Sequence, residues 1–283
     1  MIFDSKQLFQ QLLRNLTTDD SREEKEAILL WLLESKLSLS RAEIMAGKKV
    51  RADQSLLDQI VYRLNNHEPL QYILEEGEFY GRKFRVDQSV LIPRPETELL
   101  VKIVVDHFQG IKQEIRLLDI GTGSGCIAIT LALELPSVTV IATDIHSDAL
   151  GIAKENAKRL TANVQFQIHD ILNDTISMGG LDAIVSNPPY ILENEKTLLQ
   201  KRVVEYEPAQ ALFVPDSNPL LFHRAIAEKA RQSLRKGGLL LTEINERLGK
   251  DTAALFKSLG YAEVKILKDL SGKDRIVIGR KKN

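Results

Sequence analysis

The sequence predicts an α/β protein in which a small helical region precedes a seven-stranded, mostly parallel sheet that carries helices on both faces. Three observations support this fold class. At 283 residues the chain is longer than most single domains. Its first 67 residues carry apolar side chains at the spacing of helices. After residue 114, short apolar runs typical of buried strands alternate with helical patterns, as in proteins built around a parallel sheet.

Residues 1–75 are expected to form an N-terminal helical domain. The apolar stripes of its first two helices are Leu8, Leu12, Leu13 and Leu16, then Ile28, Leu29, Trp31, Leu32 and Leu33. Ser40 and Glu43 form the capping-box pattern that begins a short helix, and Asp53 is suited to cap the next one. The domain serves either packing or substrate recognition, and the sequence favours neither.

Residues 76–92 predict a β-hairpin that joins two domains. Phe79, Phe84 and Val86 lie in short extended runs, with Gly81 and Asp87 as turn residues. Prolines at positions 93 and 95 then precede a helix with apolar residues between 99 and 104. Residues 93–283 are therefore expected to form the second domain.

Seven apolar runs are the expected strands of the sheet. Five lie at residues 115–120, 138–142, 164–168, 181–185 and 239–242, and two more lie at 262–267 and 275–278. Between the last two runs stands only the short stretch DLSGK at 269–273 with its flanking residues, which is too little chain for a crossover helix. The C-terminal strand is therefore expected to run antiparallel to its neighbour.

The composition argues against several classes of protein. The 38 basic and 39 acidic residues nearly cancel, which argues against a chain-wide positive field for nucleic acid. The single cysteine, Cys126, leaves no internal disulfide, and the five histidines show no metal-ligand spacing, so no metal site is expected. The first 16 residues include acids and amides, unlike a signal peptide or a membrane span. A cytoplasmic protein without membrane contact is expected.

A glycine-rich turn follows the first strand of the sheet and is typical of a nucleotide site. The turn comprises Gly121, Thr122, Gly123, Ser124 and Gly125. Because a dinucleotide fingerprint would need glycine at Cys126, the G-x-G-x-G spacing favours S-adenosylmethionine over NAD. The second strand ends at Asp144, which suits the ribose hydroxyls. After the third strand, Asp170 suits the adenine amino group, and Ile171 or Ile145 suits the ring face. Together these residues predict a site for S-adenosylmethionine and its product S-adenosylhomocysteine.

The fourth strand leads directly into Asn187, Pro188, Pro189 and Tyr190, which we expect at the same edge of the sheet as the glycine turn. A planar nitrogen has a delocalised lone pair and two hydrogens that need acceptors. The side-chain oxygen of Asn187 and the carbonyl oxygen of Pro188 can accept these hydrogens and orient the nitrogen. The prolines restrict the backbone, and Tyr190 is suited to stack on the flat target group. No strong general base is needed, because the methylated nitrogen loses its proton readily.

Residues 93–283 are thus expected to form a class I, Rossmann-like S-adenosylmethionine-dependent methyltransferase domain, which acts on an amide or an exocyclic amine. One alternative is an adenine-N6 or guanine-N2 methyltransferase that acts on RNA or DNA, because the same tetrapeptide can serve a flipped base. The near-neutral charge counts against it. Another is a cofactor-binding protein without activity. Residues 191–219 form either a lid over the substrate or a surface excursion.

Six motifs resemble those of the HemK/PrmC-type protein-(glutamine-N5) methyltransferases. They are HEPLQYI at 67–73, VLIPRPETELLV at 90–101, LLDIGTGSGCIAI at 117–129, SNPPYI at 186–191, YEPAQAL at 206–212 and LKDLSGKDRIVIGR at 267–280. The resemblance implies that the substrate is the glutamine of the Gly-Gly-Gln motif in class-1 peptide chain release factors. It implies that Asn187 and Pro188 hold the glutamine amide, that Tyr190 lines the pocket, that Asn187 also borders the cofactor, and that the helical domain grips the factor. A monomer that binds no nucleic acid is the simplest expectation.

The chain departs from the pattern of this family in two places. Glu75 stands where the family usually has glycine, and residues 213–221 lack the family's glycine-rich stretch. The first departure concerns the start of the hairpin, and the second concerns a loop on the substrate side. The catalytic and cofactor motifs are intact.

Overall fold

The computed structural model describes residues 1–282 and divides the chain into two compact units. The first unit is Met1–Glu76 together with Gln200–Tyr206, and the second is Gly77–Leu199 together with the chain from Glu207 onward. The chain therefore passes between the units three times. Residues 1–282 include no helix with the length and apolar character of a membrane span.

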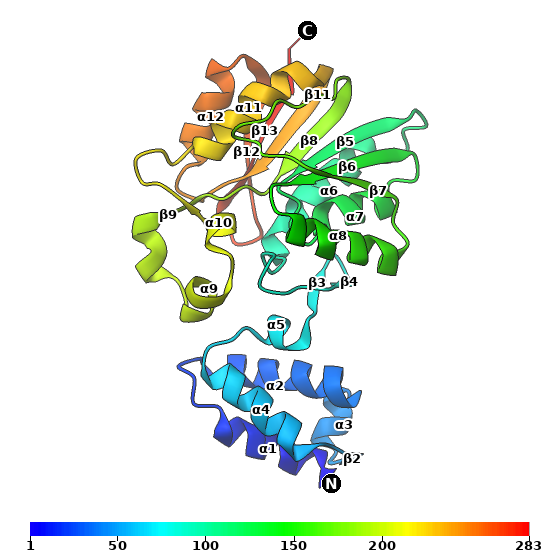
Figure 1. Ribbon diagram of the computed structural model, residues 1–283, viewed down its shortest axis with the longest axis vertical. Coiled ribbons are helices and arrows are strands. Elements are labelled where there is room, and N and C mark those ends of the chain that lie inside the picture. Colours follow the sequence, from blue (N-terminus) through cyan, green and yellow to red (C-terminus); the bar gives the residue numbers. More distant parts are fainter. Residues whose placement is uncertain (283) are drawn as a thin grey trace. The chain divides into compact units, whose positions relative to one another are not determined.

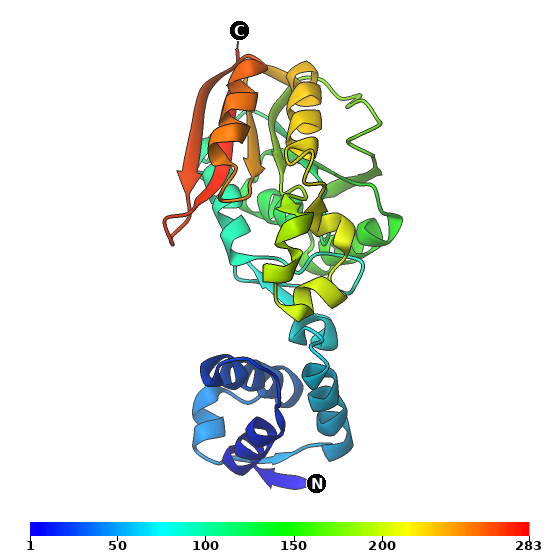
Figure 2. The ribbon, with the colours of Figure 1, turned by 90° about the vertical axis from the view of Figure 1, so that its left-hand side faces the viewer.

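The first unit is built mainly from helices that bury one leucine-rich core (residues 1–76 are blue to cyan and α9 is yellow-green in Figures 1 and 2). Its elements are β1 (Ile2–Asp4), α1 (Ser5–Asn15), α2 (Arg22–Leu37), α3 (Arg41–Met45), β2 (Lys49–Arg51), α4 (Gln54–Asn65), α5 (Leu70–Leu74) and α9 (Lys201–Tyr206). Leu12, Leu32 and Leu33 are fully buried, because the apolar stripes of α1 and α2 face each other. The predicted helical stripes are confirmed.

The predicted starts of two helices are also confirmed. At α3, the Ser40 side chain accepts from the backbone N–H of Glu43, and the Glu43 carboxylate accepts from the backbone N–H of Ser40. At α4, the Asp53 carboxylate accepts from the backbone N–H groups of Ser55 and Leu56. Each contact satisfies a donor that the first helical turn leaves unpaired.

The expectation of helical structure from residue 2 onward was wrong at two short stretches. Strands β1 and β2 pair antiparallel, with Phe3 opposite Val50. Asp4 caps α1 in an extended conformation, so the residues before it are extended as well. Gly47, at φ +70°, turns the chain after α3 and brings the second strand alongside the first.

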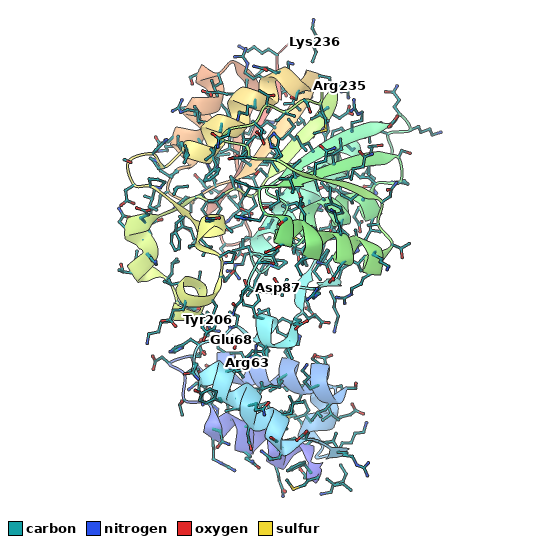
Figure 3. The ribbon with its side chains drawn as sticks, in the orientation of Figure 1. Arg63, Glu68, Asp87, Tyr206, Arg235 and Lys236 are labelled. Atoms are coloured by element: carbon teal, nitrogen blue, oxygen red, sulfur yellow. The ribbon has the colours of Figure 1, made fainter. Side chains whose placement is uncertain are left out.

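Helix α9 belongs to the first unit although it lies more than 120 residues after α5 in the sequence. Its Tyr206 hydroxyl donates to the carbonyl oxygen of Asn66 at 2.8 Å, and the Arg202 guanidinium pairs with Asp20. Figure 3 shows Tyr206 beside Arg63 and Glu68, which form an ion pair of their own at 2.6 Å. Local sequence gave no signal for this placement, because it depends on contacts between distant residues.

The second unit is a seven-stranded sheet between two layers of helices. Its sheet has the order β12-β13-β11-β8-β5-β6-β7. The strands are β5 (Ile115–Ile120), β6 (Val138–Asp144), β7 (Val164–Ile168), β8 (Leu181–Ser186), β11 (Leu234–Glu243), β12 (Tyr261–Lys268) and β13 (Asp274–Lys281). Only β13 runs against its neighbours, because it pairs antiparallel with both β11 and β12. The predicted mostly parallel sheet with an antiparallel C-terminal strand is confirmed.

Side chains of the sheet point alternately into two cores. In β5, Leu117 belongs to the core formed with α6 and α7, whereas Leu118 belongs to the core formed with α11 and α12. The helices of the unit are α6 (Glu98–Phe108), α7 (Cys126–Glu134), α8 (Ser147–Leu160), α10 (Ala209–Leu212), α11 (Leu221–Ser233) and α12 (Gly249–Ser258). Both faces of the sheet are covered, which explains why its strands read as nearly continuous apolar runs.

The hairpin predicted between the two domains is present at the start of the second unit. Strands β3 (Gly77–Phe79) and β4 (Arg82–Phe84) pair around Tyr80 and Gly81, both at positive φ. Phe79 and Phe84 are fully buried in the core with α6 and α7. The next residues, up to the 3-10 turn η1 (Pro95–Thr97), form no strand.

Residues 191–219 contain several short elements. Strand β9 (Ile191–Leu192) pairs parallel with β10 (Phe213–Val214), and the 3-10 turn η2 (Glu193–Leu198) follows β9. The two ends of this stretch are thus joined in the second unit, while α9 groups with the first unit.

The strand order changes direction beside β5, which places the ends of two strands at one point. β6 and β7 follow β5 on one side, and β8 lies on its other side, with Ile120 opposite Ser186. The residues that follow these strands, Gly121 and Asn187, therefore start at neighbouring positions on the carboxyl edge of the sheet. Open α/β sheets bind ligands at such a switch point.

Candidate active site

A cavity of about 430 Å³ lies at this edge of the sheet, within the second unit. Its volume falls in the range of small-molecule sites. The predicted residues that line it are Gly121, Thr122, Gly123, Ser124, Asp144, Asp170, Ile171, Asn187, Pro188 and Pro189. Further lining comes from residues next to these in the sequence and from the stretches 89–97 and 208–226. Of the predicted site residues, Gly125 and Tyr190 lie outside it.

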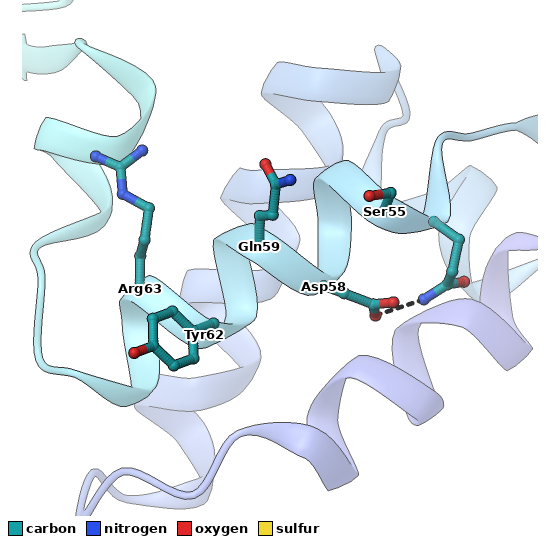
Figure 4. A pocket seen from close by; sticks show the side chains of 6 residues that line it. Ser55, Asp58, Gln59, Tyr62 and Arg63 are labelled. Atoms are coloured by element: carbon teal, nitrogen blue, oxygen red, sulfur yellow. Dashed lines mark hydrogen bonds between the residues drawn. The ribbon is translucent and has the colours of Figure 1, made fainter.

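A second hollow, along α4 in the first unit, offers a contrast. Figure 4 shows its lining, which comes from six residues of that one helix, including Tyr62 with 71% of its surface exposed. One internal hydrogen bond joins Gln54 to Asp58 at 2.7 Å. The hollow is open to solvent and brings together no groups from different elements. The cavity of the second unit is therefore the candidate active site.

The glycine turn leaves its backbone open toward the cavity. Gly121 and Gly123 have φ of +73° and +52°, and a Cβ atom built on either would meet no atom within 4 Å beyond the adjacent residues of the chain. A ligand can therefore approach the main chain closely at both positions. Gly125 differs, because a Cβ atom there would lie 2.8 Å from Ile129 and 3.1 Å from Ala153. It permits the close packing of α7 on α8 and has no direct part in the lining.

Asp144 holds the glycine turn and also faces the cavity. One of its carboxylate oxygens accepts from the backbone N–H of Gly123 at 2.9 Å, and the other accepts from the backbone N–H of His146 at 3.0 Å. A carboxylate oxygen has two lone-pair directions, so each oxygen retains room for one further donor. That arrangement suits a pair of ribose hydroxyls.

Asp170 lies after β7 and is engaged by its own loop. Its carboxylate accepts from the backbone N–H of Leu172 at 2.8 Å and from the side-chain amide of Asn173 at 2.6 Å. Desolvation raises the pKa of Asp170, but the hydrogen bonds from Leu172 and Asn173 outweigh it, so the pKa is lowered. Its neighbour Ile171 is buried and supplies an apolar wall. Ile145, which is 52% exposed, lines the cavity as well.

The tetrapeptide presents two acceptors to the cavity. The Asn187 side-chain nitrogen donates to the Thr97 hydroxyl oxygen at 3.2 Å. Within residues 1–282, no hydrogen bond reaches the side-chain oxygen of Asn187 or the carbonyl oxygen of Pro188. Both oxygens are thus available to a group with two N–H bonds, as an amide nitrogen has.

Tyr190 turns away from the cavity. Its hydroxyl donates to the Glu243 carboxylate at 2.9 Å. Burial and the negative charge of Glu243 raise the pKa of Tyr190 well above its ordinary value, so the phenol stays protonated. Stacking of Tyr190 on the target group remains a prediction. The contact that Tyr190 makes in the structure, with Glu243, holds the tetrapeptide in place.

Comparisons with known proteins agree with this geometry. Residues 95–212 match the family model described as methyltransferase small domain. A release factor glutamine methyltransferase from Bacteroides thetaiotaomicron is 45% identical over 259 residues, which cover 90% of this chain and 92% of the relative. The chain belongs to the release factor glutamine methyltransferase family. The relative of the same name from Bacillus subtilis is 37% identical over 92% of both chains. The resemblance inferred from the motifs is confirmed.

A solved structure supports the fold of this family member. A methyltransferase from Pyrococcus furiosus matches with a TM-score of 0.52 and 19% identity, over 82% of this chain and the whole of that chain. The sheet is accordingly that of a class I, Rossmann-like methyltransferase. The methyl donor is S-adenosylmethionine.

The cavity of this methyltransferase fits S-adenosylmethionine on two counts. The open space over Gly121 and Gly123 admits a ligand against the backbone. Asp144 retains lone pairs toward the cavity. Asp119, at the end of β5, accepts from the Thr122 hydroxyl at 2.7 Å, while its second carboxylate oxygen is buried without a hydrogen bond among the described residues. Burial raises the pKa of Asp119 to about 7. Asp119 is fully buried and does not line the cavity, so its contact with Thr122 supports the glycine turn from within the protein.

Sequence reasoning missed the residues behind the tetrapeptide of this methyltransferase. Thr97 donates from its hydroxyl to the Glu243 carboxylate at 2.7 Å, and the other oxygen of that carboxylate accepts from Tyr190. Burial raises the pKa of Glu243 above its ordinary value, and the hydrogen bonds from Thr97 and Tyr190 and the charge of Arg275 offset this rise only in part. Arg275 is itself paired with Asp269 at 3.0 Å. Thr97 lies in the motif IPRPETE at 92–98 and Arg275 in the motif DLSGKDR at 269–275, but neither motif indicated what these residues do.

A second pair joins two of the family motifs at the rim of the cavity. The Arg94 guanidinium donates to the Glu207 carboxylate at 2.5 Å, and the backbone N–H of Ile92 donates to the same group at 3.2 Å. The Glu207 side chain is almost fully buried, with 1% exposed. Because a buried carboxylate needs such partners, this contact holds the IPRPETE and YEPAQAL stretches together.

Proposed function

We propose that this enzyme methylates the side-chain amide nitrogen, N5, of the glutamine in the Gly-Gly-Gln motif of class-1 peptide chain release factors. The observation that carries the proposal is the pair of unengaged acceptors, the Asn187 side-chain oxygen and the Pro188 carbonyl, in the same cavity as the glycine turn. The curated relatives are named for glutamine methylation of release factors. The proposed substrate also implies a cytoplasmic enzyme, because translation is terminated there.

The residues of the tetrapeptide supply orientation. S-adenosylmethionine supplies an electrophilic methyl group on its sulfonium. Asn187 and Pro188 accept the two amide hydrogens of the glutamine and thereby fix the nitrogen in one direction. The proline rings restrict the backbone of these acceptors. No basic side chain is required, because an alkylated amide nitrogen gives up its extra proton to water.

The cofactor is assigned to Gly121, Thr122, Gly123 and Ser124 of the turn, with Asp144 at the ribose and Asp170 and Ile171 at the adenine. Gly125 supports the turn from behind. The acceptors of Asn187 and Pro188 then form the border between cofactor and substrate. Pro189 and Tyr190 form the far end of the tetrapeptide, where the Tyr190 hydroxyl is bound to Glu243.

The first unit is proposed to recognise the body of the release factor. Its support is the exposed face of α4, where the exposed side chains of Tyr62 and Arg63 combine aromatic and charged surface. Exposed tyrosine is common where proteins bind proteins. The enzyme is proposed to act as a monomer and to bind no nucleic acid.

The test is a methyl-transfer assay. The enzyme is incubated with methyl-labelled S-adenosylmethionine and, separately, release factor, release factor with alanine in place of the motif glutamine, RNA and DNA. Label is expected in the intact release factor alone. Asn187→Ala is expected to lower transfer by a factor of about 100 to 1,000, as loss of an oriented polar group in an active site does, while cofactor affinity largely survives. Label in RNA or DNA, and none in the release factor, would overturn the proposal.

A further inference from the structure

We infer that the Thr97 hydroxyl and the Glu243 carboxylate form a relay that fixes which end of the Asn187 side chain faces the substrate. The inference rests on the proposed function, because it explains how the same site presents its acceptor to the glutamine amide. Thr97 and Glu243 are positioning residues, since they act on the reaction through Asn187.

The problem that the relay solves is the near-symmetry of the asparagine amide. Its oxygen and its nitrogen are almost equal in size, so rotation by half a turn would present a donor in place of an acceptor. A donor at that position would face the N–H bonds of the substrate amide and repel it. The site therefore needs a contact that distinguishes the two ends of Asn187.

Thr97 can make that distinction because its hydroxyl has one hydrogen. The hydrogen is committed to Glu243, at 2.7 Å, because both oxygens of that carboxyl group accept hydroxyl hydrogens, one from Thr97 and one from Tyr190. The hydroxyl then has only lone pairs to offer Asn187. The nitrogen end of Asn187 turns toward Thr97, at 3.2 Å, and the oxygen end is left for the substrate.

Glu243 is held in place by two further groups. It is 1% exposed, and its second oxygen accepts from the Tyr190 hydroxyl at 2.9 Å. The charge of Arg275 opposes part of the rise in the pKa of Glu243 that burial causes, and Asp269 pairs with Arg275 at 3.0 Å. One carboxylate thus anchors both ends of the tetrapeptide, Asn187 through Thr97 and Tyr190 directly.

The experiment compares Thr97→Val with Thr97→Ser. Valine has the shape of threonine without the hydroxyl, whereas serine keeps the hydroxyl. Thr97→Val is expected to lower kcat for release factor methylation about tenfold, with cofactor Kd unchanged, because one oriented hydrogen bond is lost. Thr97→Ser is expected to retain most of kcat. Thr252→Val, at another fully buried threonine far from the tetrapeptide in sequence, is the control for the packing change and is expected to match the wild type.

A second readout does not depend on the substrate. The side-chain NH₂ protons of Asn187, identified in a nitrogen-15 NMR spectrum by their loss in Asn187→Asp, are expected to exchange with solvent about tenfold faster in Thr97→Val than in the wild type or Thr97→Ser. If the wild type transferred no methyl group to release factor, the proposed function would fail, and this measurement would still decide the relay.

The double variant Thr97→Val with Glu243→Gln tests whether the two residues act together. Members of one relay are not additive, so its kcat is expected to be no lower than that of the worse single variant. Multiplied losses would overturn the relay. Wild-type kcat and exchange in Thr97→Val, or equal impairment in Thr97→Ser and Thr97→Val, would overturn it as well.

Discussion

Asp144 accepts hydrogen bonds from the backbone of Gly123 and of His146, which its place in the sequence did not predict. Its position at a strand end predicted a ribose ligand, and the structure adds that it fixes Gly123 through a backbone hydrogen bond. A single carboxylate therefore shapes the turn and lines the cavity with lone pairs to spare. A change at Asp144 is therefore expected to affect both the shape of the turn and the binding of the ligand.

Asp144→Asn is expected to raise the Kd for S-adenosylmethionine about tenfold to a hundredfold. The amide keeps the size of the carboxylate but replaces one acceptor with a donor and removes the charge-assisted hydrogen bonds. Calorimetric titration measures the effect. Asp148→Asn, at an exposed position in the first turn of α8, removes an equal charge nearby and should leave the Kd unchanged. Equal affinities for wild type and Asp144→Asn would remove Asp144 from the ribose role.

Asp119 should make the stability of the second unit depend on pH. Burial raises its pKa from an ordinary value of 3.8 to about 7, so folding favours its protonated form. The stabilising contribution is complete below the ordinary pKa and is lost as the pH rises to about 7, at no more than about 1.4 kcal/mol per pH unit.

The cofactor-free wild type is therefore expected to lose stability relative to Asp119→Asn between about pH 4 and pH 7. Urea unfolding of both proteins at several pH values measures the difference. The comparison cancels other groups, such as His223, whose pKa burial lowers to about 4. A difference that stays constant over this range would contradict the pH dependence assigned to Asp119.

At the scale of elements, apolar patterns located the strands well and their ends less well. The predicted runs at 115–120 and 164–168 coincide with β5 and β7. β11 begins at Leu234, five residues before the predicted run, because Gly237 at positive φ and a register shift allow the chain to bend and continue pairing. The charged residues and glycines at 235–238 are typical of a turn. The start of β11 is therefore set by pairing with its neighbours in the sheet and not by local sequence.

Glu75 shows how a departure from the family pattern takes physical form. It ends α5 in the left-handed conformation, at φ +54°, where glycine is favoured. A residue with a Cβ atom pays about 1–2 kcal/mol for this conformation, while glycine loses about 0.5–1 kcal/mol through the greater freedom of the unfolded chain.

Glu75→Gly is expected to stabilise the first unit by about 0.5–1 kcal/mol, since relief of the left-handed strain exceeds the entropic cost. The fluorescence of Trp31, the single tryptophan of the chain and a residue of α2, reports unfolding of this unit in urea. Glu75→Ala keeps the strain and should give no gain. A loss of stability in Glu75→Gly equal to that in Glu75→Ala would show that the side chain contributes more than the strain costs.

At the scale of the whole molecule, long-range polar contacts explain motifs whose purpose the sequence did not reveal. Thr97 and Glu243 lie 146 residues apart, and Arg94 and Glu207 lie 113 residues apart. Such pairs leave no periodic signal, since each partner looks locally like a turn residue or a strand end. The cofactor turn and the tetrapeptide were predictable because parallel strands bring their carboxyl ends to one edge.

The division of the chain into two units could also be predicted only in part. Helical spacing and the hairpin indicated two parts, but α9 joins the first unit through Arg202 and Tyr206. No local pattern distinguishes α9 from a helix of the catalytic domain. The stretch after the tetrapeptide is thus shared between a unit proposed to recognise the release factor and a unit that holds the cofactor.

The most direct test of the account is the destination of the methyl label in the presence of release factor, RNA and DNA. The account predicts label on the side-chain nitrogen of the Gly-Gly-Gln glutamine, none after replacement of that glutamine by alanine, and a loss of about 100-fold or more in Asn187→Ala at nearly unchanged cofactor affinity. Label on a nucleic-acid base, or full transfer by Asn187→Ala, would contradict it.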